Sequence, residues 1–232
     1  MTKPNTFSLL TFLFISLLHF KLMAQVKLDS KSYDAKNIKK VEINSPKGEV
    51  KVSANENGKV EVSVEKIQFD PKCRMAFSEV GTTLKIVIDQ ENIIFDKANC
   101  VTKISVKMPK DIPLEISTGT SSVSTEGITS EIGFKSATGP FMGIGLNSNF
   151  SAATATGAIN LKYANCPNRA DIDLMTASSD AEITFSRNCK LKVSHKSATG
   201  ELFNEIGESK DYKVKVSMKS ASGSLKILKS TK

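Results

Sequence analysis

The stretch Phe150-Ser-Ala-Ala-Thr-Ala-Thr-Gly-Ala-Ile-Asn-Leu161 decides the fold, because its central motif, Thr154 to Gly157, recurs along the chain. The six copies occupy residues 118–121, 136–139, 154–157, 176–179, 197–200 and 220–223. Their last residues are 18, 18, 22, 21 and 23 positions apart. Self-similarity at a period of about 20 residues indicates a stacked repeat architecture.

Aligning the copies on the last motif residue places similar side chains in columns. The position seven residues earlier is always apolar: Leu114, Ile132, Phe150, Ile172, Val193 and Val216. The position five residues earlier holds Ile116, Phe134, Ala152, Leu174, His195 and Met218. Alternate side chains of a strand share a face, so these columns and the Ser/Thr columns of the motif lie on one side. A second short alternating segment follows the motif in most copies.

Each copy therefore predicts a strand, a tight corner and a second strand. Four corners end in Gly139, Gly157, Gly200 and Gly223, which we expect to be structural because glycine adopts a positive φ without steric cost. One unit cannot bury its apolar face alone, whereas a stack shares a continuous core. The prediction is an all-β, single-domain β-solenoid of stacked repeats about 18–23 residues long. An ordinary β-sandwich with similar hairpins is the alternative.

The segment before the repeats is also rich in predicted strands but has a different rhythm. Apolar and polar residues alternate over residues 41–43, 49–52, 59–64, 84–88 and 104–108. Residues 66–100 interrupt this pattern, and we expect them to form a disulfide-tied hairpin that covers one end of the stack. The predicted organisation is a strand-rich region over residues 25–112, followed by the solenoid repeats over residues 113–232.

The first 24 residues have the features of a secretory signal peptide. Lys3 precedes an apolar run from Phe7 to Phe20, and cleavage is expected near Ala24-Gln25. An uncleaved anchor is the alternative. No later segment contains 18 consecutive apolar residues, so no membrane span is predicted in the mature chain. The protein is expected in the periplasm, on the outer surface or outside the cell.

The basic charge of the chain is spread rather than clustered. The formal net charge is +8, and removal of Lys3 and Lys21 with the signal peptide leaves about +6. Arginine occurs only at Arg74, Arg169 and Arg187, tryptophan is absent, and no basic run is interleaved with aromatic residues. Nucleic acid is therefore not an expected partner.

The four cysteines of the mature chain predict two disulfides in an oxidising compartment. Cys166 and Cys189 follow their motifs by nine and ten residues, which places them almost in phase on neighbouring repeats. Cys73 and Cys100 flank the strand predicted over residues 84–88 and would pair by elimination. Zinc binding is the alternative, but the cysteines lack C-x-x-C spacing and histidine partners.

The signal peptide, the turn-rich leader and the repeated Ser/Thr-Ala-Ser/Thr-Gly corners together resemble the DUF4097-type putative adhesin family of bacterial β-strand repeat proteins. The resemblance covers roughly residues 41–229 and is best over residues 114–228. It implies an exported β-solenoid with an adhesive or envelope role. It supplies no catalytic residue that could be transferred to this chain.

Catalytic chemistry has few candidates in this sequence. His195 is the one histidine outside the signal peptide, and it falls in an apolar column, where we expect a locally hydrogen-bonded residue beside Leu174 and Met218. Asp180 and Glu201 occupy the same column one repeat apart, a spacing that paired acids of a glycan-cleaving enzyme would need. Solvated surface acids explain this pair better.

Three classes of function remain open from the sequence. The first is a non-catalytic, exported, adhesin-like solenoid that binds a surface polymer or an envelope protein. The second is a periplasmic, envelope-associated interaction or sensing module, and the third is a polysaccharide-active enzyme. No cofactor or metal is predicted, and the oligomeric state stays open.

Overall fold

A computed structural model describes residues 28–90 and 99–230 of the protein. The signal peptide predicted over residues 1–24 lies outside the described residues. Within the described ranges the regular structure is all β, apart from a single 3₁₀ turn at Ala35–Asn37. No helix in this part of the chain is long and apolar enough to cross a membrane.

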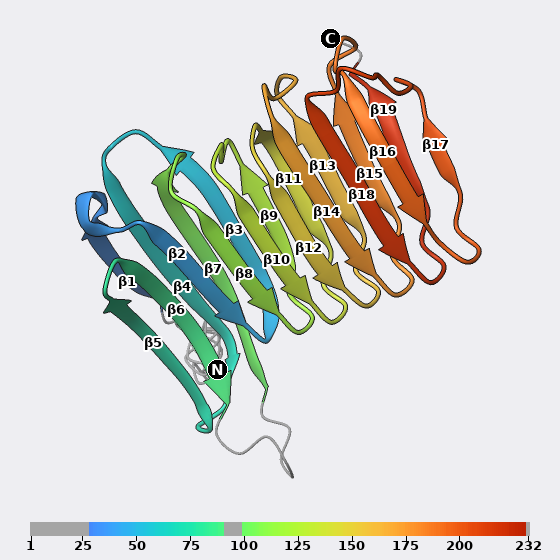
Figure 1. The fold of residues 1–232 in the computed structure, drawn as a ribbon. Helices are drawn as coiled ribbons and strands as arrows, with labels where there is room; N and C mark the ends of the chain where they lie inside the picture. The colour runs from blue at the N-terminus through green and yellow to red at the C-terminus, as the bar shows by residue number, and fades with distance from the viewer. Residues whose placement is uncertain (1–27, 91–98, 231–232) are drawn as a thin grey trace, which may run out of the picture.

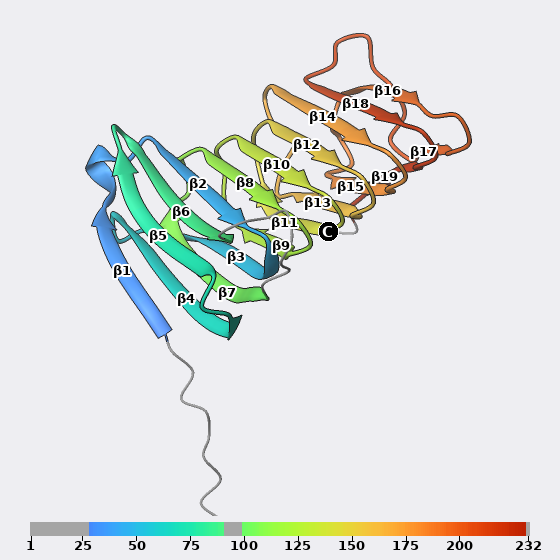
Figure 2. The same ribbon diagram turned by 90° about the horizontal axis from the view of Figure 1, so that it is seen from below.

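The strands form two sheets that face each other as two layers (Figures 1 and 2). The ten-stranded sheet runs, in spatial order, through β1 (Leu28–Asp34), β4 (Lys59–Phe69), β7 (Cys100–Pro109), β3 (Lys47–Asn55), β9 (Ser122–Glu126), β11 (Phe141–Leu146), β13 (Ile159–Tyr163), β15 (Ala181–Phe185), β19 (Leu225–Lys229) and β17 (Leu202–Asn204). The nine-stranded sheet runs through β16 (Leu191–Lys196), β18 (Val214–Ser220), β14 (Ala170–Thr176), β12 (Phe150–Thr154), β10 (Ile132–Ser136), β8 (Leu114–Thr118), β2 (Lys40–Ser45), β6 (Thr83–Gln90) and β5 (Cys73–Val80).

From β8 onwards the chain alternates between the sheets, and we call each consecutive pair of strands, such as β8 with β9, a coil. Equivalent strands of neighbouring coils are parallel, and their register is the one that the sequence columns predict. The column that begins at Leu114 continues through Ile132, Phe150 and Ile172 on β10, β12 and β14. Most strands thereby bury one face in a shared core, whereas the edge strands β1 and β17 contain no buried residue.

The spatial order of the coils departs from the chain order at both ends of the stack. The coil β18–β19 lies between β14–β15 and β16–β17, so β16 and β17 are edge strands although β18 follows them in the chain. At the opposite end, β6 and β7 lie outside β2 and β3. At one end of the stack, the later strands β18 and β19 thus lie inside the earlier β16 and β17. At the other end, the earlier strands β2 and β3 lie inside the later β6 and β7 (Figure 1).

Antiparallel strands cover the end of the stack that contains the N-terminal part of the described chain. β1 and β4 extend the ten-stranded sheet beyond β7, and β5 pairs with β6 in the nine-stranded sheet. The hairpin predicted within residues 66–100 is thus present as β5 and β6. It is more than a cover, because β6 also pairs in parallel with β2 and continues the stack.

The core between the layers is filled from both sheets. Phe134 and Phe150 project from the nine-stranded sheet and meet Phe141 from the ten-stranded sheet, with ring centroids 5.0 and 4.8 Å apart. All three side chains are fully buried. Burying a side chain of this size contributes about 1.5–3 kcal/mol, so the repeated apolar columns stabilise the stack along its whole length.

Candidate functional site

A trough of about 510 Å³ crosses the outer face of β8, β10, β12 and β14 in the nine-stranded sheet. One row of outward positions, set by the strand register, reads Glu115, Gly133, Ser151 and Asp173. The two central residues are small, whereas the two outer ones carry carboxylates. Strand alternation turns these residues outward because their chain neighbours belong to the apolar columns.

A second outward row, Lys135, Ala153 and Met175, has the same small centre. Met175 is 61% exposed, although methionine is usually buried. An added Cβ on Gly133 would meet only side-chain atoms of Glu115 and Ser151 at 3.7 Å, so packing does not require a glycine there. The hollow therefore arises from missing side chains on an otherwise regular sheet.

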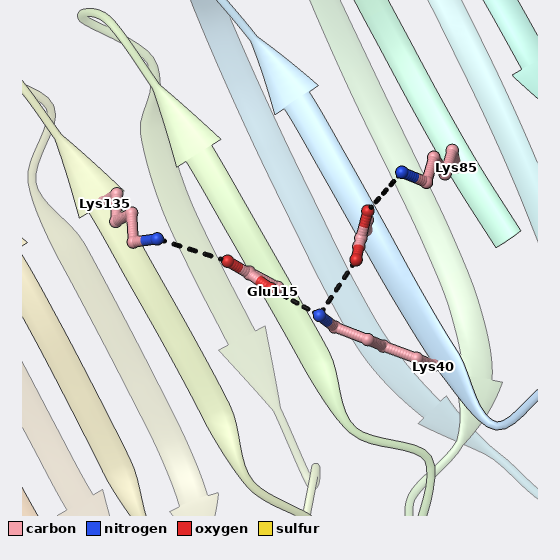
Figure 3. Close-up of polar contacts among 5 residues, drawn as sticks. Lys40, Lys85, Glu115 and Lys135 are labelled. Atoms are coloured by element: carbon pink, nitrogen blue, oxygen red, sulfur yellow. Dashed lines mark hydrogen bonds and ion pairs between the residues drawn. The ribbon is translucent and has the colours of Figure 1, made fainter. Parts of the chain in front are cut away.

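One wall of the trough is formed by Lys40, Glu115 and Lys135. They belong to a chain of ion pairs that continues beyond the trough to Glu42 and Lys85 (Figure 3). Lys40 Nζ lies 2.5 Å from Glu115 Oε2 and 2.9 Å from Glu42 Oε1. Lys135 Nζ lies 3.4 Å from Glu115, and Lys85 Nζ lies 3.1 Å from Glu42. Charges of opposite sign thus alternate across β6, β2, β8 and β10.

The ion pairs hold these groups in their charged forms. The pKa of Lys40 is raised, first by its hydrogen bond to Glu115 and then by that to Glu42. The pKa of Glu115 is lowered chiefly by Lys40, and the pKa of Glu42 is lowered chiefly by Lys40 and then by Lys85. A general acid or base needs a pKa near the working pH. This wall therefore supplies fixed charges for binding rather than a group poised for proton transfer.

Both disulfides expected from the sequence are present. Cys166–Cys189 has a Cα–Cα distance of 5.1 Å and joins the segment before β14 to the segment before β16. Cys73–Cys100 has a Cα–Cα distance of 5.6 Å and ties the start of β5 to the start of β7. The second bond therefore links the two sheets at the covered end.

The corner glycines lie between the two strands of a coil, but the positive φ that we expected at them is wrong. Gly139, Gly157, Gly200 and Gly223 all have a φ outside the left-handed region. A Cβ added to each would lie only 1.9–2.0 Å from a backbone oxygen of the neighbouring coil. Glycine is required because the corners of adjacent coils approach each other this closely.

Hydroxyl groups of the motif complete the corners. The backbone N–H of Gly139 donates to Ser136 Oγ at 2.7 Å, and equivalent bonds of 2.7–3.1 Å form at the other three glycines. Between coils, Thr118 Oγ1 donates to Ser136 Oγ at 3.0 Å and Thr176 Oγ1 donates to Ser220 Oγ at 2.9 Å. The abundant serine and threonine residues are therefore structural groups rather than nucleophiles.

The candidates for catalysis do not assemble into a site. His195 Nε2 donates to the carbonyl oxygen of Gly223 at 3.0 Å, and Met218 is its partner in the sheet. The expected contact with Leu174 is wrong, because Leu174 pairs with the opposite side of Met218. Local backbone bonding at the edge of the sheet accounts for this histidine.

The expectation that Asp180 and Glu201 lie one coil apart is also wrong. The out-of-order coil places Ser224 between them, where its N–H donates to Asp180 Oδ1 at 2.8 Å. Ser224 Oγ in turn accepts a bond of 3.2 Å from the N–H of Glu201. Within residues 28–90 and 99–230, no group of three or more His, Cys, Asp or Glu side chains could hold a metal ion.

Our sequence reasoning did not identify the trough, although the alignment contained a signal for it. The column six residues before the motif end reads Glu115, Gly133, Ser151, Asp173, Ser194 and Ser217. Small residues in an outward column, next to charged ones, mark a depression once the register is known. We interpreted the apolar columns, which form the core, rather than this outward column.

Comparison with solved structures shows a fold that this chain shares with another protein. No family model and no curated protein matches the chain. A crystal structure of a putative cell adhesion protein from Clostridium sporogenes matches with a TM-score of 0.52 and 13% identity, covering 89% of this chain and 100% of that one. A putative adhesin from Bacteroides fragilis matches with a TM-score of 0.43 and 15% identity, covering 87% of this chain and 97% of that one. At the level of the fold, this chain is thus similar to the Clostridium sporogenes protein.

Proposed function

We propose that the protein is an exported, adhesin-like β-solenoid that binds a surface polymer or an envelope protein and performs no catalysis. The trough carries this proposal, because its small-residue floor and its wall of fixed charges offer a recessed polar surface to a ligand. The Clostridium sporogenes protein of similar fold is described as a putative cell adhesion protein, which agrees with such a role.

The repeated corners support the finer assignment to a solenoid of the DUF4097 type. The two parallel layers and the matching register of the coils are the features that a solenoid requires. We retain residues 25–112 as a strand-rich region and residues 113–232 as the solenoid repeats. Since β2 pairs with β8 and β3 with β9, both parts contribute to the same sheets.

Two disulfides support export, because such bonds persist in oxidising compartments. We propose that residues 1–24 are removed near Ala24-Gln25 and that the mature chain works at the cell envelope or surface. Protease treatment of intact cells distinguishes a surface adhesin, which is degraded, from a periplasmic sensing module, which is protected.

The trough suits an extended polar ligand. Its floor crosses four strands, a span of about 14 Å at the usual strand spacing. Glu115, Lys135 and Asp173 at its borders offer both donors and acceptors. A chain of sugar units or an extended peptide loop would use both, whereas a small apolar ligand would use neither.

Binding of labelled residues 25–232 to cell envelopes isolated from the source organism tests the proposal. Gly133→Tyr fills the trough, and Ser124→Tyr on the outward face of β9 is the matched control on the other sheet. We expect saturable binding that falls at least tenfold in Gly133→Tyr and persists in Ser124→Tyr. Prior protease treatment of the envelopes distinguishes a protein partner from a polymer. Binding that is absent, or unaffected by Gly133→Tyr, contradicts the proposal.

A further inference from the structure

A second feature of the nine-stranded sheet lies at its other end, on the outer face of β16 and β18. The register places like residues opposite each other in three successive outward pairs: Lys192 with Lys215, Ser194 with Ser217, and Lys196 with Lys219. The four lysines are exposed and the two serines are half-buried. We call these six residues the lysine face.

The lysine face is electrostatically unfavourable for the folded protein. Like charges directly opposite on neighbouring strands are destabilising. Within the described part of the chain, no ion pair is formed by any of the four lysines. Asp171 and Asp173 on β14 border the face, in register with Lys215 and Ser217. Asp171 therefore offsets part of the repulsion at Lys215, whereas Lys196 and Lys219 face each other with no acid in register. Such paired lysines suit a ligand of opposite charge.

An aromatic ring stands beside the lysine face. Tyr212 is 44% exposed, and Lys192 Nζ lies 5.4 Å from the centroid of its ring. Next to them is a hollow of about 330 Å³ lined by Lys192, Glu208, Ser209, Lys210 and Tyr212. The ring is thus accessible from the same side as the charges.

The segment that carries Tyr212 is held in place. The backbone N–H of Ser209 donates to the carbonyl oxygen of Leu191 at 2.8 Å, and the backbone N–H of Lys213 donates to the carbonyl oxygen of Lys190 at 2.9 Å. Asp211 pairs with Lys190 and accepts a hydrogen bond from Ser209 Oγ. These bonds fix the backbone on both sides of Tyr212 relative to β16, so ligand binding would not have to order this segment.

We propose that the lysine face and Tyr212 form a binding site for an anionic polysaccharide. Lysine ammonium groups attract carboxylate, phosphate or sulfate, the serine hydroxyls exchange hydrogen bonds with sugar hydroxyls, and the Tyr212 ring packs on a sugar face. The two lysine pairs lie four residues apart along the strands, or about 13 Å. That separation fits successive charges of a polymer better than a single small anion. This site uses other strands than the trough and does not depend on it.

Two other anionic macromolecules fit the site less well. Single-stranded nucleic acid is bound on several stacking rings, commonly with arginine, whereas this site has one ring and no arginine. A membrane surface is bound by apolar side chains that enter the lipid along with basic ones. Here the lysine face has the lone Met175 in register with Lys219.

Binding measured on the mature chain with named probes tests the proposal. The probes are heparin and alginate as anionic polysaccharides, neutral dextran, phosphatidylglycerol vesicles and a single-stranded oligonucleotide. We expect heparin or alginate to bind, dextran not to bind, and the affinity to fall with added salt. Each exposed charge contributes on the order of a twofold to fivefold factor, so the variant K192Q/K196Q/K215Q/K219Q should lose at least about tenfold in affinity.

Matched variants keep the test specific. K47Q/K107Q/K162Q/K229Q removes the same charge from exposed lysines of the ten-stranded sheet and should retain most of the affinity. Tyr212→Ala should weaken binding several-fold, and Tyr212→Phe should not. Equal losses in both quadruple variants, no binding of either anionic polysaccharide, or tighter lysine-dependent binding of vesicles or oligonucleotide would each overturn the proposal. All substituted side chains are exposed, so the variants are expected to fold, and circular dichroism of each variant checks this.

Discussion

At one end of the nine-stranded sheet, across β6, β2, β8 and β10, each outward lysine of the ion-pair network has a glutamate beside it. At the other end, across β18 and β16, lysine stands opposite lysine. Both ends carry a disulfide nearby and an out-of-order segment, so they are built in similar ways. The comparison teaches that the cross-strand neighbour decides whether an exposed charge is balanced within the fold or faces a like charge.

Removal of each disulfide compares how the two ends are constructed and should have the largest effect. The sequence separations are 27 for Cys73–Cys100 and 23 for Cys166–Cys189. The chain-entropy model therefore predicts nearly equal losses of about 3.5 kcal/mol in unfolding free energy for the two double Cys→Ser variants. Urea denaturation measures both. A difference above about 1 kcal/mol would show that one end depends on its disulfide for more than loop closure.

Corner glycines test whether an interior coil is more constrained than an edge coil. Gly157→Ala places a Cβ 2.0 Å from the oxygen of Gly139, with further coils on the other side. Gly200→Ala places a Cβ 2.0 Å from the carbonyl oxygen of Gly223, but Gly200 belongs to the edge coil, which can shift outward. We expect losses of about 3 kcal/mol and about 1.5 kcal/mol respectively.

Gly133→Ala is the control for this pair, because its Cβ would have ordinary contacts at 3.7 Å. Its unfolding free energy should change by less than about 0.5 kcal/mol. Equal costs at Gly157 and Gly200 would show that the edge coil is as rigid as the interior.

Neutralising one charge at each end tests the comparison directly. Glu115→Gln removes the carboxylate shared by Lys40 and Lys135 and should cost about 1 kcal/mol. Lys219→Gln relieves its repulsion with Lys196, has only Met175 in register on its other side, and should raise stability by about 0.3 kcal/mol. Thermal melts at low salt measure both changes. The same sign for both variants would contradict the distinction between the two ends.

The smallest expected effect is a pH dependence that belongs to the ion-paired end. The folded-state pKa values of Glu42 and Glu115 are lowered, chiefly by Lys40. Their contribution is therefore complete above the unfolded pKa of about 4.3 and is lost as the pH falls through the lower folded values. Glu115→Gln should show a smaller drop in Tm between pH 6 and pH 3 than the wild type. An unchanged drop would assign the acid sensitivity to other groups.

The strands and the core could be predicted to a large extent from the sequence. The alternating segments at residues 41–43 and 104–108 lie within β2 and β7, and the apolar columns match the sheet register. The strand β1 was missed because its sequence, LDSKSYD, offers little apolar alternation. Local pattern is sufficient where every second residue is apolar and insufficient where polar residues dominate.

The order of the last coils could not be predicted, because the columns do not encode which coil lies next to which. Val193 and Val216 occupy the same column, so either could follow Ile172. The lysine face depends on that order, because Lys192 lies beside Lys215 only after these neighbours have been assigned. The trough does not depend on it, since β8, β10, β12 and β14 lie in chain order.

The insertion of β18 and β19 into the stack has a consequence for how the protein is made. Synthesis delivers β16 and β17 before the two strands that hold them, since β16 bonds to β18 and β17 to β19. Until residues 214–229 emerge, β14, β15, β16 and β17 present unpaired backbone edges of the kind that aggregate. Docking of this final pair covers the exposed edges of β14 and β15 and one edge each of β16 and β17. Maturation of this end is therefore a single late event rather than growth by one coil at a time.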